Sequence, residues 1–111
     1  MKYKVNIVET AEEDIFEIYK CVYLNDSEEK AEKLYTNIQK RIIALQENPQ
    51  RGRAPKELQL FQMKEFLEIQ FKPYRIIYQI IEKNVYVHCI LDGRRDMQSL
   101  LHERLLRTGQ I

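Results

Sequence analysis

The chain opens with an alternation of apolar and polar residues. Within residues 3–8, Tyr3, Val5 and Ile7 lie on one side and Lys4 and Asn6 on the other, and this two-residue period is typical of a half-buried strand. The pattern therefore predicts a first strand that ends near Glu9.

Two segments then carry apolar residues at three- and four-residue steps, the period of one helical face. The first covers about residues 10–24, and the second follows a short polar segment and ends before Pro49. A proline pushes the residue before it out of the helical region, so Asn48 is expected to end the second helix. Two antiparallel helices result. The expected capping residues are Thr10 with Glu13 in a capping box for the first helix, and Asp26 or Ser27 for the second.

The second half of the chain reads as a loop, a sheet and a last helix. Residues 50–63 are basic and have little periodicity, which predicts a surface loop. Three segments rich in apolar, β-branched and aromatic residues follow and predict strands, and short turns at Lys72-Pro73 and Lys83-Asn84 would join them as hairpins. Asp96 can cap a final helix with an apolar stripe. The expected strands are residues 66–71, 74–81 and 85–91.

The element order is thus β-α-α-β-β-β-α, which is typical of the α+β class. We expect one domain over residues 1–111, in which an antiparallel four-stranded sheet packs against the N-terminal helical hairpin in two layers. The C-terminal helix completes the fold.

Composition excludes several classes of protein. The 111 residues are 44% hydrophobic and 32% charged, which argues against disorder. No apolar run is long enough to span a membrane and no signal-peptide pattern is present, so we expect a cytoplasmic protein without a membrane partner.

Cys21 and Cys89 are expected to be buried, reduced thiols. Because His88 and His102 have no partner at ligand spacing, we expect no metal and no other cofactor.

Charge is uneven along a chain whose net charge is only +1. Residues 1–50 carry ten acids and seven bases, whereas residues 51–111 carry seven acids and eleven bases. An anion-facing surface should therefore lie in the second half. Its candidates include the loop arginines Arg51 and Arg53, although a charged loop by default only favours solubility.

Four motifs in this order and spacing resemble the RelE/ParE toxin superfamily of bacterial type II toxin-antitoxin systems. The resemblance covers nearly the whole chain and implies the same fold as the periodicity. It is carried by the early helix AEEDI at residues 11–15, the helix end LQENP at residues 45–49 with Gly52 after it, the strand YRIIY at residues 74–78, and the strand end DGRRD at residues 92–96.

Arg75 is the main candidate for a site. Alternation places it on the face opposite Tyr74, Ile76 and Tyr78, where the next strand can bring it near Arg94 and Arg95. Three converging guanidinium groups would hold a nucleic-acid backbone or a partner's carboxylates. The alternative is structural: Arg75 pairs with Glu68 or Glu82 of a neighbouring strand.

The resemblance gives two of these arginines a specific role. In the ribosome-dependent RelE branch the residue that matches Arg75 contacts messenger RNA, and the one that matches Arg95 stabilises charge at the cleaved phosphate. The chain departs from that branch at its acid-base groups, because Phe66, Glu68 and Gln70 replace the branch's lysines or arginines, and Leu101 replaces its C-terminal tyrosine. The remaining acid-base candidates are Tyr78 and His102, followed by Tyr74, Glu68 and Glu103.

Three functions follow from the resemblance. The first is a ParE-like toxin that interferes with DNA gyrase by protein contact and needs no catalytic residues; the incomplete acid-base set favours it. The second is a RelE-like, ribosome-dependent mRNA endonuclease, which the retained arginines favour. The third is an inactive module that binds an antitoxin. All three imply a cognate antitoxin as partner, and the target would be gyrase or the ribosome with its mRNA.

Overall fold

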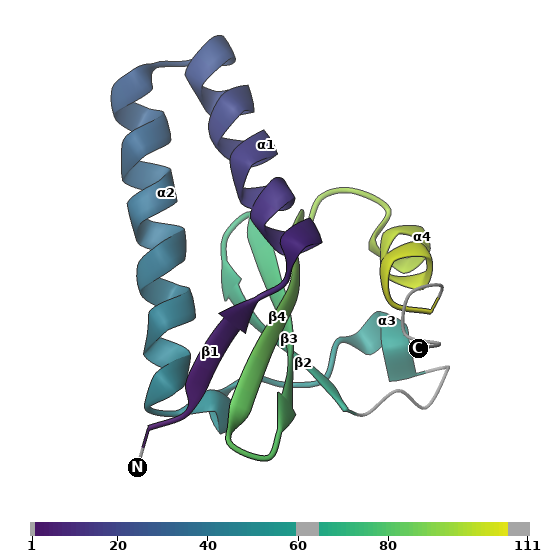
Figure 1. The fold of residues 1–111 in the computed structure, drawn as a ribbon. Helices are drawn as coiled ribbons and strands as arrows, with labels where there is room; N and C mark the ends of the chain where they lie inside the picture. The colour runs from purple at the N-terminus through teal and green to yellow at the C-terminus, as the bar shows by residue number, and fades with distance from the viewer. Residues whose placement is uncertain (1, 60–64, 107–111) are drawn as a thin grey trace.

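A computed structural model describes residues 2–59 and 65–106, and Figure 1 shows its elements. The helical and strand order predicted from the sequence is present, with short 3-10 turns at Ala44–Gln46 and Pro49–Arg51 and a short helix added before the second strand. The elements are β1 (Lys4–Ile7), α1 (Glu9–Asn25), α2 (Glu28–Ile43), α3 (Lys56–Gln59), β2 (Phe66–Phe71), β3 (Tyr74–Ile81), β4 (Asn84–Asp92) and α4 (Met97–Leu101), which continues as a π-helical turn over His102–Leu106.

The four strands form one sheet in the order β1-β4-β3-β2. β2, β3 and β4 form the predicted antiparallel meander, whereas β1 runs parallel to β4, from Lys4 opposite Asn84 to Ile7 opposite Val87. The expectation of a wholly antiparallel sheet was therefore wrong in this one pair. A parallel pair needs a long crossover connection, and the helical hairpin together with the meander supplies it. The α+β class is confirmed.

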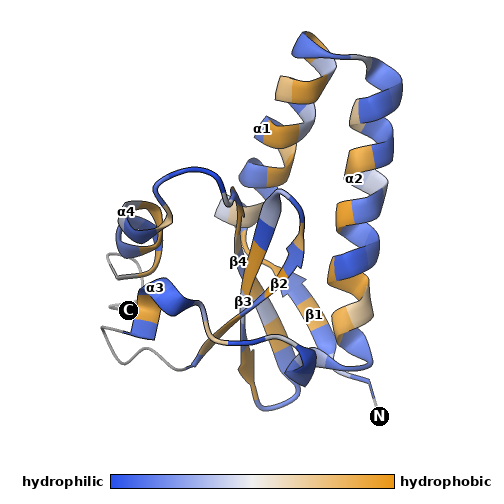
Figure 2. Cartoon of the chain, turned by 180° about the vertical axis from the view of Figure 1, so that it is seen from behind, coloured by the Kyte–Doolittle hydropathy of each residue, from blue (hydrophilic) through white to orange (hydrophobic). Residues whose placement is uncertain are grey.

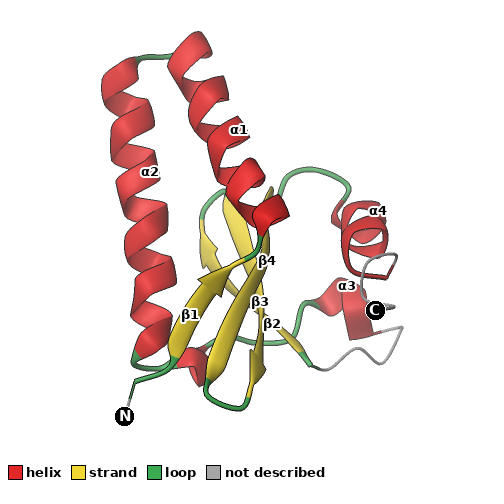
Figure 3. Cartoon of the chain, viewed as in Figure 1, coloured by secondary structure: helices red, strands yellow, loops and turns green. Residues whose placement is uncertain are grey.

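Each face of the sheet is covered by helices. The hairpin of α1 and α2 packs on one face, and α3 and α4 lie on the other, as Figure 3 shows. The prediction of two layers thus foresaw the last helix but not that it covers the second face, and it missed α3. Figure 2 shows the corresponding apolar stripes. The hairpin-side core includes Ala11, Ile15, Ile38, Ile42, Ile76, Tyr78 and Val87, and the core on the other face includes Leu58, Phe66, Ile77, Cys89, Leu91, Met97, Leu101 and Leu105.

A bulge in β4 determines which of its residues face which core. Ile77 lies opposite Cys89 and Tyr78 lies opposite Val87, so His88 is the extra residue. Before the bulge, Val87 points to the hairpin; after it, Cys89 and Leu91 point to α4. The strand therefore supplies apolar side chains to both cores, and Leu91 lies opposite Arg75 in the register of β3 and β4.

Two of the three predicted caps are present. The Ser27 hydroxyl accepts the Lys30 N–H at 3.1 Å, and the Asp96 carboxylate accepts the Ser99 N–H at 3.2 Å. The capping box of Thr10 was wrong, because α1 begins one residue earlier, at Glu9, with Val8 before it and no side-chain cap. A Thr10 inside the first turn cannot occupy the capping position.

Two further expectations need correction. Residues 50–63 are not a plain loop, since α3 lies within them and Arg53 pairs with Glu68 beside β2; residues 60–63 lie outside the described part. Cys89 is buried as expected, but Cys21 is exposed on α1. Within the described ranges, no helix has both the length and the apolar character to cross a membrane.

Candidate arginine cleft

A cleft of about 600 Å³ lies at the end of the sheet where the turn between β2 and β3 meets the end of β4. The Gly93 N–H donates to the Pro73 carbonyl at 2.7 Å and joins the two segments. A Cβ on Gly93 would lie 2.9 Å from Cδ of Arg75, so the absence of a side chain there lets β4 pass close to the arginine. The cleft is lined by Arg53, Ala54, Lys56, Gln59, Glu68, Gln70, Lys72, Pro73, Tyr74, Arg75, Gly93 and Arg94.

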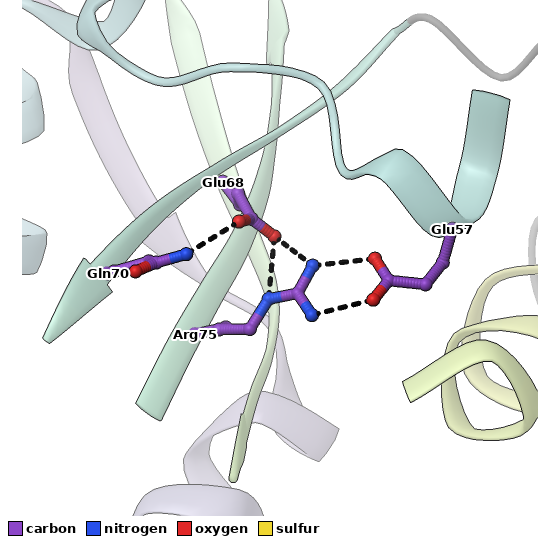
Figure 4. Close-up of polar contacts among 4 residues, drawn as sticks. All are labelled: Glu57, Glu68, Gln70 and Arg75. Atoms are coloured by element: carbon purple, nitrogen blue, oxygen red, sulfur yellow. Dashed lines mark hydrogen bonds and ion pairs between the residues drawn. The ribbon is translucent and has the colours of Figure 1, made fainter. Parts of the chain in front are cut away.

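Arg75 lies between two carboxylates, as Figure 4 shows. Its Nη1 and Nη2 donate to Glu57 at 2.9 and 2.7 Å, and its Nε donates to Glu68 at 2.9 Å. Nη2 also contacts Glu68, whose second oxygen accepts a bond of 3.2 Å from Gln70. The Arg75 side chain is only 12% exposed. Both edges of the guanidinium group are therefore occupied by acids of the same chain.

These contacts fix the charge state of the cluster. The hydrogen bonds from Arg75 hold the pKa of Glu57 below its ordinary value, and the carboxylates of Glu57 and Glu68 raise the pKa of Arg75 further above neutrality. At neutral pH the guanidinium thus carries one positive charge beside two negative ones. The three side chains together carry a net charge of −1, so this cluster repels a phosphate rather than attracting one.

The sequence-based alternative for Arg75 is therefore what the structure shows. The pairing with Glu68 was foreseen, because the two residues lie on adjacent strands; Glu82 instead occupies the turn between β3 and β4. Glu57 was missed, because it belongs to a segment without periodicity. One signal was available: Glu57 is the only acid among the basic residues of segment 50–60.

The other predicted arginines are partly brought together. Arg94 and Arg53 line the cleft beside Arg75, whereas Arg51 lines an adjacent hollow with Arg41. Arg95 is exposed on the loop after β4, where its N–H donates to the Asp92 carbonyl at 3.1 Å.

Arg94 also pairs with an acidic residue of the same chain. It donates two side-chain hydrogen bonds to Asp92, at 2.9 and 2.7 Å, and remains 74% exposed. Arg94 holds the pKa of Asp92 at about 2. This arginine is thus an exposed, paired cation at the mouth of the cleft.

Of the acid-base candidates, Tyr78 has a clear structural role. Its buried hydroxyl donates to the Pro49 carbonyl at 2.6 Å and accepts the Gly52 N–H at 3.1 Å. A Cβ on Gly52 would lie 2.3 Å from this oxygen, so only glycine allows the approach. Burial raises the pKa of Tyr78. A hydroxyl enclosed in this way is placed to hold the 49–52 turn to the sheet and not to donate a proton to a substrate.

The two histidines lie apart from the cleft lining. His102 is exposed on the turn after α4. His88 places Nε2 at 3.0 Å from the Gln79 amide oxygen and packs its ring edge-on against Phe66, and burial lowers its pKa. These contacts give His88 a polar and an aromatic partner within the sheet. Among the described residues, no group of three His, Cys, Asp or Glu side chains is placed to hold a metal ion.

Solved toxin structures share this fold. The chromosomal ParDE toxin-antitoxin system from P. aeruginosa has a chain that is 17% identical, with a TM-score of 0.69 over 80% of this chain and 94% of its own. A chain of the toxin-antitoxin complex RelBE2 from Mycobacterium tuberculosis is 15% identical, with a TM-score of 0.60 over 83% and 92%. A double arginine-to-alanine variant of the E. coli toxin RelE in the free state is 17% identical, with a TM-score of 0.64 over 97% and 99%.

The sequence also matches a family model. No curated protein matches the chain. The family model of the ParE toxin of the type II toxin-antitoxin system parDE matches residues 5–97, from β1 to the start of α4. This range includes the helical hairpin, the whole sheet and the arginine cleft. The chain therefore belongs to the ParE toxin family of type II toxin-antitoxin systems.

Proposed function

We propose that this toxin arrests growth by contacting DNA gyrase and that it does not cut RNA. The observation that carries the proposal is the pairing of Arg75 with both Glu57 and Glu68. RNA cleavage needs a cation that neutralises the growing charge on the phosphate. An arginine that two internal carboxylates already neutralise is poorly suited to that role, whereas it serves well as a rigid part of a protein-binding surface.

The acid-base chemistry of the cleft supports the same choice. Tyr78 is enclosed between two backbone groups, and Glu68 is engaged by Arg75 and Gln70. Neither is placed to move a proton at a bound ribose. A toxin that acts by protein contact needs no such groups. The family match to the ParE toxin points in the same direction.

One observation favours the second candidate, a ribosome-dependent mRNA endonuclease. Arg53, Lys56, Lys72 and Arg94 surround Arg75 in the cleft lining, and such a ring of cations suits a nucleic-acid backbone. In this case Arg75 and Arg95 would act as the phosphate-binding and transition-state cations, and Glu57 would have to leave Arg75 when RNA binds.

Two assays with the purified protein separate the candidates. We expect loss of DNA supercoiling by gyrase, with trapped cleavage complexes, and intact transcripts in a translating extract. Transcripts cut at ribosomal A-site codons, together with normal supercoiling, would instead select the endonuclease. In that case Arg75→Ala and Arg95→Ala should each abolish cutting, at a cost of several kcal/mol in transition-state stabilisation.

A cognate antitoxin is the proposed partner. The support is the family match to a toxin of the parDE system and the fold shared with chains of the ParDE and RelBE2 systems. Expression of the chain alone should arrest growth, and co-expression of the antitoxin should restore it. Robust growth with abundant folded protein would contradict both toxin functions and would leave the inactive antitoxin-binding module.

A further inference from the structure

The arginine cleft holds more positive charge than its internal acids neutralise. Five cations line it, and three carboxylates pair with them: Glu57 and Glu68 at Arg75, and Asp92 at Arg94. Two positive charges remain on the rim, so the cleft attracts anions although its central arginine is already paired. The five cations are Arg53, Lys56, Lys72, Arg75 and Arg94.

The two carboxylates on Arg75 are anchored differently. Glu68 belongs to β2, its backbone pairs with Arg53 on one side and Ile77 on the other, and it contacts the Nε edge of the guanidinium. Glu57 belongs to the four-residue helix α3, outside the sheet, and it contacts the terminal nitrogens. Figure 4 shows the two acids on opposite sides of the arginine.

A four-residue helix gains little stability from its own hydrogen bonds. The position of α3 therefore depends on its tertiary contacts. These contacts include Leu58, which is buried against the core beside α4, and the Glu57 pair itself. Glu68 is fixed by the sheet, whereas Glu57 can be displaced from Arg75 without breaking a strand.

We propose that the Glu57 carboxylate is an exchangeable internal ligand of Arg75, and that an acidic side chain of a partner protein takes its place. The terminal edge of a guanidinium group fits a carboxylate bidentately, as Glu57 shows. Replacing one carboxylate by another leaves the charge at Arg75 unchanged, and the surplus cations of the rim attract an acidic segment.

A nucleic acid fits this exchange less well. Each phosphate that reached Arg75 would bring its neighbours along the backbone close to Glu68, which stays in place. A protein can present one carboxylate alone. The choice of a protein ligand rests on the proposed function, whereas the exchange at Glu57 does not.

The test uses the full chain and an acidic probe, a ten-residue poly-glutamate peptide, with binding measured by calorimetry at low salt. Glu57→Gln keeps the shape of the side chain and weakens its hold on Arg75, so we expect this variant to bind the peptide about tenfold more tightly than the wild type does. Glu65→Gln is the matched control, because it makes the same charge change at an exposed position just before β2. Adding Arg75→Gln to Glu57→Gln should remove the gain.

Equal affinities of the Glu57→Gln and Glu65→Gln variants would overturn the proposal. Tighter binding of an RNA oligonucleotide of equal charge would overturn the choice of a protein ligand. If Glu57→Gln does not fold, the wild type is titrated with the peptide and followed by NMR, and the Arg75 side-chain resonance must shift. No shift at Arg75 would overturn the proposal. Gyrase is absent from these measurements, so their failure is distinct from failure of the supercoiling assay.

Discussion

Arg104, on the turn after α4, donates two hydrogen bonds to Asp14 of α1, at 3.0 and 2.9 Å. One oxygen of Asp14 also accepts the Ile90 N–H at 3.0 Å. This N–H lies on the side of β4 where β1 has already ended, at Val87. Asp14 thus joins the first helix, the last strand and the C-terminal turn.

Replacing Asp14 should therefore cost stability. Asp14→Ala leaves the Ile90 N–H without its acceptor and Arg104 without its partly buried partner, and we expect a loss of about 2–4 kcal/mol in the free energy of unfolding. Urea denaturation followed by circular dichroism measures it. Glu17→Ala on the exposed side of α1 is the control, with an expected change within about 0.5 kcal/mol. Equal midpoints for the two variants would show that the junction contributes nothing.

Tyr78→Phe separates a structural role from a catalytic one. The change leaves the Pro49 carbonyl and the Gly52 N–H unpaired in a buried place, so stability should fall by about 1–3 kcal/mol. Growth arrest by the folded variant should persist, because the hydroxyl does not reach a substrate. Thermal unfolding and a growth assay at matched protein levels test both parts. A fully stable variant that no longer arrests growth would reverse this interpretation.

The two thiols should react very differently. Cys21 is exposed, whereas Cys89 is buried beneath α4, and burial raises its pKa to about 12. A thiol reagent at neutral pH should therefore label one cysteine rapidly and the second only as the protein unfolds. Cys21→Ser should remove the rapid phase and leave the slow one. Rapid labelling of Cys89 in the folded Cys21→Ser variant would mean that α4 does not cover this face of the sheet in solution.

Asp92 should contribute to the acid sensitivity of the fold. Hydrogen bonds from Arg94 lower its pKa from the ordinary 3.8 to about 2. Because the pKa is lower in the folded state, this pair stabilises the protein fully above pH 4, and the contribution is lost as the pH falls from about 4 to about 2. Arg94→Gln should make the free energy of unfolding depend less on pH in that window. Near pH 7 the pH dependence should stay almost the same. Urea midpoints measured from pH 2 to pH 7 test this, with Arg51→Gln, at an exposed position elsewhere, as the charge-matched control. Parallel profiles for the two variants would exclude the effect.

Much of the fold could be predicted because local patterns determine it. Three- and four-residue periodicity predicted the helical hairpin, apolar and β-branched segments joined by short turns predicted the meander, and Ser27 and Asp96 marked two helix starts. The parallel pairing of β1 with β4 could not be predicted in this way, because no local pattern records which distant strand becomes a neighbour. The same holds for the bulge at His88, which decides that Cys89 faces α4.

Only part of the candidate site could be predicted from the sequence. Alternation placed Arg75 on the correct face, and its strand neighbour Glu68 was a foreseeable partner. Glu57 was missed, because its contact depends on the position of the four-residue helix α3, which is too short to show a helical period; its place as the lone acid in a basic segment was the one signal. The sequence therefore offered the pairing of Arg75 only as one of two possibilities. The structure shows this pairing, and the proposed function depends on it.

The parallel pair of β1 and β4 also has a consequence for biosynthesis. Lys4 lies opposite Asn84, 80 residues further along the chain. The edge of β1 therefore stays unpaired until β4 has been synthesised. A nascent chain emerging from the ribosome cannot complete the sheet until β4 has been synthesised. Gly93 and Arg94 of the arginine cleft directly follow β4, so this cleft also forms only after the strand that pairs with β1 has been made.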